Sequence, residues 1–114
     1  MPQAKSFWQA LISSTSPNFQ IWREALMYAK IRDYSYTYYI KHYPDFLTLE
    51  NVTQTFKIQL EFEKGRIIIT FKVLLPLFKT VIKQEQNKFK QDLAKYLFEK
   101  KIASLDAEII ILIV

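Results

Sequence analysis

Lysine side chains are the first group in this sequence whose type and spacing could do chemistry. On a helix, a basic stripe would be formed by Lys79, Lys83, Gln86 and Lys90. Lys57 and Lys72 lie on the polar face of a predicted strand pair and could extend this stripe into a phosphate-binding patch for nucleic acid. An ordinary solvated helix flank explains the same pattern, so both explanations stay open.

Tyrosine side chains form the densest aromatic cluster of the chain, and its members are Tyr34, Tyr36, Tyr38, Tyr39 and Tyr43. Beside Arg32 and Lys41, these rings could stack on nucleic-acid bases. They could also form a protein interface, where tyrosine is favoured. Packing on a sheet is the most ordinary explanation, followed by the interface and then by base stacking.

Groups for acid–base or metal chemistry are sparse. His42 is the only histidine, and only Asp45 lies near it in the sequence, so a structural histidine is favoured over a catalytic one. Glu61 and Glu63 point to the same side of a strand and could approach a cation together. A solvated strand face with Glu63 opposite Arg66 is the simpler interpretation. The sequence therefore predicts no catalytic site, no metal site and no cofactor.

The composition of the 114-residue chain narrows the classes of function further. Gly65 is the single glycine, which leaves no glycine-rich phosphate loop, nucleophile elbow or dinucleotide fingerprint. There is no cysteine, so disulfides and thiolate chemistry are excluded. The formal charge of +5 permits an acidic partner or nucleic acid, although many ordinary domains are this basic. The length predicts one domain, residues 1–114.

The sequence shows no segment that we expect to enter or cross a membrane. Met1 to Ser14 lacks the apolar core of a signal peptide. The longest apolar run, from Ile109 to Val114, is far too short to span a bilayer. Together with the lack of cysteine, these features predict a cytoplasmic protein without a membrane partner.

Two alternating segments predict a β-hairpin from Thr53 to Val73. Apolar residues occupy every second position on both sides of Lys64-Gly65. A two-residue turn there gives the cross-strand pairs Phe62–Ile67, Leu60–Ile69, Ile58–Phe71 and Phe56–Val73. All four pairs lie on one face, which another element must cover. The register predicts that Leu60 and Ile69 are buried neighbours.

Helical patterns come before the hairpin and after it. Apolar spacing predicts a short helix over about residues 3–14, and Ser16-Pro17 begins a second helix that ends near Ile31. Pro76 begins a long helix to about Lys101, with a bend or break possible near Glu85 and Gln86. The apolar stripe of this long helix is Phe78, Ile82, Phe89, Leu93 and Tyr96.

Two further strands are predicted. Alternating tyrosines indicate a strand from Tyr34 to Tyr43, which Pro44 ends, while residues 45–51 stay ambiguous. The apolar, β-branched run from Ala107 to Val114 predicts a strand buried on both faces in the interior of the sheet. The resulting fold class is α+β, with one sheet and helices packed on its apolar face.

This order of elements resembles the K-homology-like modules of bacterial replication proteins. The segment from Arg66 to Ile82, in which Leu77-Phe78-Lys79 opens a helix, is similar to the C-terminal domain of clamp-loader gamma/tau subunits. Trp8 in the first helix and the closing strand from Glu108 to Val114 are also similar. The N-terminal domain of the replication initiator has the same order of elements. The tyrosine strand is extra, and the Gly-x-x-Gly loop of RNA-binding K-homology domains is absent.

The resemblance implies a module that makes protein contacts and does not catalyse a reaction. We therefore expect a non-catalytic interaction module whose partner is a replisome protein or a second copy of the chain. An exposed edge at the tyrosine strand would be the interface, with Tyr36 and Tyr38 near the contact. The alternative is a small basic nucleic-acid-binding protein that uses Lys57, Lys72, Lys79, Lys83 and Lys90.

Overall fold

The computed structural model describes residues 17–103 and 107–114, with side chains from residue 21 onward. The chain divides into two compact units, Met1–Lys30 and Ile31–Val114, and the boundary falls inside helix α2 (Pro17–His42). A single domain over residues 1–114 stays a prediction. The short helix expected over residues 3–14 lies outside the described residues.

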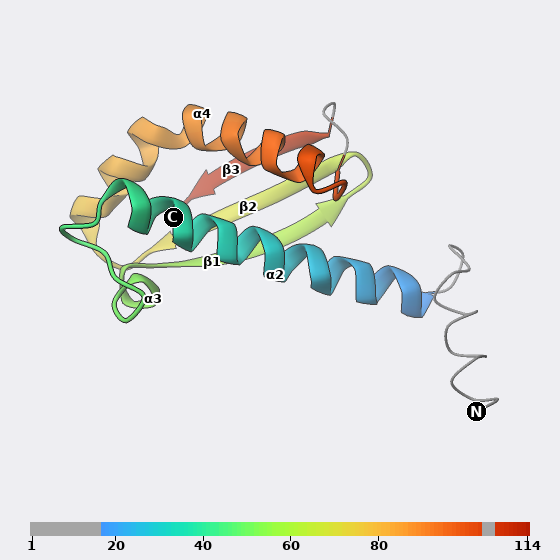
Figure 1. Cartoon of the computed structure of the whole chain (residues 1–114), viewed down its shortest axis with the longest axis horizontal. Helices are drawn as coiled ribbons and strands as arrows, with labels where there is room; N and C mark the ends of the chain where they lie inside the picture. Colours follow the sequence, from blue (N-terminus) through green and yellow to red (C-terminus); the bar gives the residue numbers. More distant parts are fainter. Residues whose placement is uncertain (1–16, 104–106) are drawn as a thin grey trace. The chain divides into compact units, whose positions relative to one another are not determined.

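The second unit has the predicted α+β class. After the C-terminal part of α2 come α3 (Val52–Thr55), β1 (Phe56–Glu63), β2 (Arg66–Val73), α4 (Pro76–Glu99) and β3 (Glu108–Ile113). The strands form a three-stranded sheet in the order β1-β2-β3. Helix α4 connects β2 to the parallel strand β3 and lies across one face of the sheet (Figure 1). No helix in the described part of the chain is both long and apolar enough to cross a bilayer.

The hairpin has the predicted register. Strands β1 and β2 are antiparallel, and Phe62 pairs with Ile67, Leu60 with Ile69, Ile58 with Phe71 and Phe56 with Val73. Gly65 has a φ of 74°, in the left-handed region that glycine adopts without steric cost. Ile69 of the central strand β2 is fully buried, whereas Leu60 of the edge strand β1 is only half-buried.

The prediction for the last strand is wrong in its position. Strand β3 lies at an edge of the sheet, and β2 is the interior strand. Ile109 is buried, but Leu112 on the opposite face is 47% exposed. Helices in the described part of the chain cover only one face of this sheet, so an entirely apolar run does not here indicate burial on both faces.

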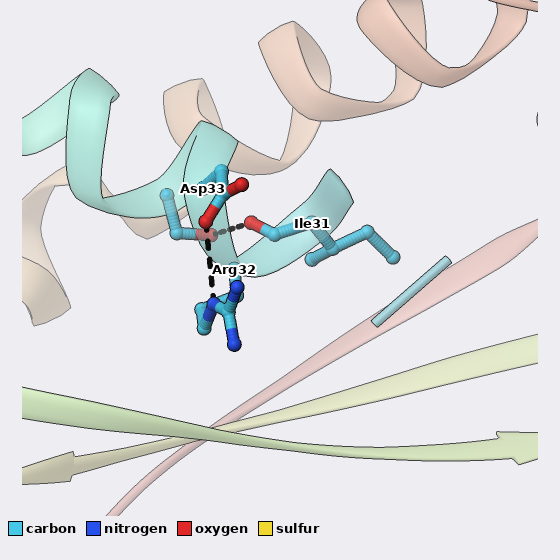
Figure 2. Close-up of polar contacts among 4 residues, drawn as sticks. Ile31, Arg32 and Asp33 are labelled. Carbon is cyan, nitrogen blue, oxygen red and sulfur yellow. Dashed lines mark hydrogen bonds and ion pairs between the residues drawn. The ribbon is translucent and has the colours of Figure 1, made fainter. Parts of the chain in front are cut away.

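The predicted strand from Tyr34 to Tyr43 is also wrong, because α2 continues as a helix to His42. The buried residues of its second half are Ile31, Ser35, Tyr38 and Tyr39, which follow helical spacing. The Ser35 hydroxyl donates a 2.7 Å hydrogen bond to the Ile31 carbonyl, one turn earlier in the helix (Figure 2). Packing of this face overrides the strand preference of tyrosine. The helix stops before Pro44, which lacks the N–H needed to continue it.

Helix α4 confirms the long helix predicted from Pro76 and is continuous through Glu85 and Gln86. Its buried face is Phe78, Ile82, Phe89, Leu93 and Leu97, so Leu97 is buried where Tyr96 was expected. The ring of Phe78 stacks on Phe56 of β1, with centroids 5.7 Å apart. The core therefore lies between the sheet and the two helices.

Candidate functional site

The tyrosines proposed as an interface are largely part of the core. Tyr38 is 6% exposed and Tyr39 is fully buried. Tyr39 stacks on Phe89 of α4, with ring centroids 5.5 Å apart, and meets Phe71 of β2 edge-on. Tyr34, Tyr36 and Tyr43 are half-buried. The edge strand that would have exposed these rings does not exist, and helical packing turns them toward the sheet.

Burial changes the acid–base behaviour of these tyrosines. The pKa of Tyr34 is raised to about 12, first by desolvation and then by the Asp92 carboxylate. Desolvation also raises the pKa of Tyr38 to about 12, with further contributions from Asp92 and Glu85. The pKa of Tyr39 is raised by the same cause, and its hydroxyl has no hydrogen-bond partner among the described residues. These phenols therefore stay protonated at neutral pH and are unsuited to act as bases.

The lysines of the proposed basic patch lie on opposite sides of the sheet. Lys57 and Lys72 are direct cross-strand neighbours on the face that α4 does not cover. Lys79, Lys83 and Lys90 belong to α4, which packs on the other face. The sheet separates the two groups, so the single patch that would combine them does not form.

His42 and the carboxylates form no catalytic arrangement with the residues expected from the sequence. His42 stacks on Tyr38, with ring centroids 4.1 Å apart, and its Nδ1 lies 2.8 Å from the Tyr38 carbonyl. Asp92, rather than Asp45, shares a small cleft of about 280 Å³ with His42. No group of three potential metal ligands occurs within residues 21–103 and 107–114.

Glu63 makes an exposed ion pair with Arg66 across the hairpin, as the simpler interpretation predicted, and Arg66 also pairs with Glu108 of β3. Arg66 Nη1 lies 3.9 Å from Glu63 Oε2, and Arg66 Nε donates to Glu108 Oε2 at 3.1 Å. All three side chains are about half exposed, and exposed ion pairs contribute little to stability.

An apolar cleft of about 580 Å³ lies where α2 ends and α4 begins. One wall comes from the segment between α2 and β1, and the other comes from the start of α4. The apolar lining residues are Tyr43, Phe46, Leu47, Leu75, Pro76, Leu77, Phe78 and Val81. Phe46 is 75% exposed and Leu77 is 89% exposed, so large apolar side chains stand open to solvent at the cleft.

Hydrogen bonds fix the wall between α2 and β1. The Thr48 N–H donates to Asn51 Oδ1 at 2.8 Å, and the Asn51 N–H donates to Thr48 Oγ1 at 3.2 Å. Asn51 Nδ2 also donates to the Phe46 carbonyl at 3.0 Å. The N–H groups of Leu74 and Leu75 both donate to the Thr55 carbonyl, which ties the two walls together. The cleft is therefore built by a defined network and not by a loose loop.

The amide and hydroxyl side chains of the lining, besides that of Tyr43, are Asn51, Gln54 and Thr55, and two of these three are already engaged within the chain. The Asn51 side chain is engaged on both of its polar atoms, and the Thr55 hydroxyl donates to the Asn51 carbonyl at 3.1 Å. Burial, followed by the Glu85 carboxylate, raises the pKa of Tyr43, so its hydroxyl stays protonated. This arrangement suits apolar side chains better than a charged substrate.

Comparisons of the chain with protein-family models, with curated proteins and with solved structures give no match. The function of the cleft is therefore inferred from its own geometry. Sequence reasoning missed this site, although a signal was present. Three leucines lie next to Pro76 but outside the apolar stripe of α4, namely Leu74, Leu75 and Leu77. Two further large apolar residues, Phe46 and Leu49, lie in residues 45–51, for which the sequence predicts neither a helix nor a strand.

Proposed function

We propose that this protein is a non-catalytic protein–protein interaction module. Its apolar cleft binds the apolar side chains of an amphipathic helix from a partner protein. The observation that carries the proposal is the exposure of several large apolar side chains around one cleft, since contiguous exposed apolar surface commonly marks an interaction site. The lining residues with the greatest exposure are Phe46, Leu75 and Leu77.

The polar groups of the cleft favour a helical occupant over an extended one. An extended peptide brings unpaired N–H and C=O groups, and each needs a hydrogen-bond partner when it is buried. Asn51 and Thr55 are already engaged within the chain, which leaves the Gln54 amide as the main partner in the lining and too few groups for an extended backbone. A helix satisfies its own backbone groups and presents only side chains to an apolar groove.

The resemblance to K-homology-like replication modules suggests the class of partner. Under this proposal, the helix belongs to a protein of a bacterial replication complex in the cytoplasm. The nucleic-acid-binding alternative has less support, because the lysines do not gather on one face.

A selection experiment tests the proposal without knowledge of the partner. A phage-displayed library of amphipathic helices would be selected on the wild-type protein, and the recovered sequences would be measured against single variants. We expect Leu77→Lys to weaken binding at least about tenfold, since it places a charge in an apolar contact. Leu49→Lys is the matched control, because Leu49 is 81% exposed but does not line the cleft.

Two outcomes would contradict the proposal. One is that no helix is recovered from the library. The other is that recovered helices bind wild type, Leu77→Lys and Leu49→Lys equally well. Both substitutions are at highly exposed positions, so circular dichroism should show folded protein in each case.

A further inference from the structure

Half of the backbone hydrogen-bonding groups of strand β3 have no partner among the residues that the structure describes. The Glu108 N–H donates to the Gly65 carbonyl, and Val114 both donates to Phe71 and accepts from Val73. Even-numbered residues of β3 therefore point their backbone groups toward β2. Because the direction alternates along a strand, the backbone N–H and C=O groups of the odd-numbered residues point away from the sheet. These residues are Ile109, Ile111 and Ile113. None of the described residues bonds to these outward N–H and C=O groups.

Beyond Glu108 at its first position, β3 has no residue that protects this edge. Natural sheets guard their edges with charges, proline or bulges. The other edge strand, β1, carries Lys57, Glu61 and Glu63. From Ile109 to Ile113, β3 contains neither a charge nor a proline, and its register with β2 is uninterrupted. An unguarded apolar edge of this kind is a template for another strand.

We propose that two copies of this chain associate by antiparallel pairing of their β3 strands, with Ile111 at the two-fold axis. The pairing joins both three-stranded sheets into one continuous sheet. It uses a different surface from the tyrosine strand considered above. It is also independent of the proposed function, since no residue of β3 lines the apolar cleft.

The alternation of β3 fixes the register of this pair. Both copies must keep their helices on the same side of the joined sheet, so facing residues share the same parity. Centring on Ile111 places Ile111 opposite itself and Ile109 opposite Ile113, and each facing pair exchanges both backbone hydrogen bonds. On the open face, Ile110 then lies opposite Leu112 of the second copy. The pairing removes from water part of the Leu112 side chain, which is 47% exposed in one copy.

The β3 edge is complementary to the same edge of a second copy of the chain. In the centred register every position from 109 to 113 faces an apolar residue, so no charge faces a like charge. Glu108 faces Val114 and keeps its ion pair with Arg66 at 3.1 Å. Such self-complementarity is the condition for a two-fold interface, in which the same surface serves both subunits.

Light scattering across a range of protein concentrations tests the pairing. Wild type should reach twice the mass of one chain. Ile111→Pro should remain at the mass of one chain, because it removes a central outward N–H and leaves the bonds between β2 and β3 intact. Leu112→Lys is a second variant that cannot disturb the core, and we expect it to shift the midpoint of association at least about tenfold.

Cysteine cross-linking tests the register, because the natural chain has no cysteine. An oxidised mixture of Ile110→Cys and Leu112→Cys should form cross-linked dimers, since these positions are close non-hydrogen-bonded neighbours across the axis. Each variant alone should cross-link far less. The proposal is overturned if wild type is a monomer at every concentration, if Ile111→Pro and Leu112→Lys dimerise like wild type, or if Ile110→Cys alone cross-links as well as the mixture.

Discussion

Two apolar regions of this protein, both of which contain aromatic residues, differ in whether helices cover them and bury their side chains. The aromatic centre, made of Tyr34, Tyr38, Tyr39, Phe71 and Phe89, lies between the sheet and two helices. Phe71, Tyr39 and Phe89 are fully buried there. The apolar cleft lies beyond the end of α2 and at the first turn of α4, and there Phe46 and Leu77 stand open to solvent.

The difference shows that residue type alone does not identify an interaction surface. The tyrosine cluster has the composition of an interface, yet it packs inside the unit. The cleft has the same kinds of residue, but Pro44 and Pro76 mark the points where helical cover stops and starts. Position relative to the helix ends therefore decides which apolar group remains available to a partner.

The largest expected effect is a difference in how much each region contributes to the free energy of unfolding. Phe89→Ala should lower the free energy of unfolding by about 3–5 kcal/mol, since it removes a fully buried ring from the aromatic centre. Leu77→Ala should change it by less than about 0.5 kcal/mol, because its side chain is mostly exposed. Urea unfolding monitored by circular dichroism measures both. Equal losses would remove the distinction between the regions.

Alkaline pH should weaken the aromatic centre specifically. The pKa values of Tyr34 and Tyr38 are raised to about 12 in the folded chain, whereas tyrosine in an unfolded chain titrates near about 10. Between these values the unfolded state binds fewer protons, so stability falls as pH rises from about 10 to about 12 and is unaffected by these groups below about 10. Urea midpoints measured across this range should decrease steadily. A constant midpoint would contradict the burial of these phenols.

A smaller gain in stability is expected from Tyr39→Phe. The Tyr39 hydroxyl is buried and has no hydrogen-bond partner among the described residues. Its removal should raise the free energy of unfolding by about 1 kcal/mol, because a buried unsatisfied polar group is costly. Tyr96→Phe, at a half-buried position, is the matched control and should change stability by less than about 0.5 kcal/mol. A loss of stability in Tyr39→Phe would show that the hydroxyl is bonded.

The smallest effect is expected from the lysines. Because Lys57 and Lys72 lie on the other face from α4, the joint replacement of Lys79, Lys83 and Lys90 should change retention on heparin only slightly. Strong retention of wild type at about 50 mM salt, lost in the triple variant and falling steeply with salt, would favour the nucleic-acid hypothesis. Absence of wild-type retention under that condition would eliminate it.

The sequence predicted local pairing well and long-range placement poorly. Alternation around Lys64-Gly65 fixed the whole register of the hairpin, and Pro76 with its apolar stripe predicted α4. Alternating tyrosines give residues 34–43 a strand pattern, but helical spacing from Ile31 to Tyr39 is also present, and tertiary packing favours the helix. The leucines around Pro76 indicate exposed apolar side chains, but they do not predict the cleft, because it joins segments separated by β1 and β2 that only tertiary structure brings together.

The binding of a selected amphipathic helix, followed residue by residue, tests the central claim most directly. Isotope-labelled protein would be titrated with the helix and observed by nuclear magnetic resonance. The cleft account predicts that amide shifts concentrate at Phe46, Asn51, Leu75, Leu77 and Val81 and that Leu77→Lys abolishes them. Shifts concentrated instead on the open face of the sheet or along β3, with the cleft residues unmoved, would contradict the account.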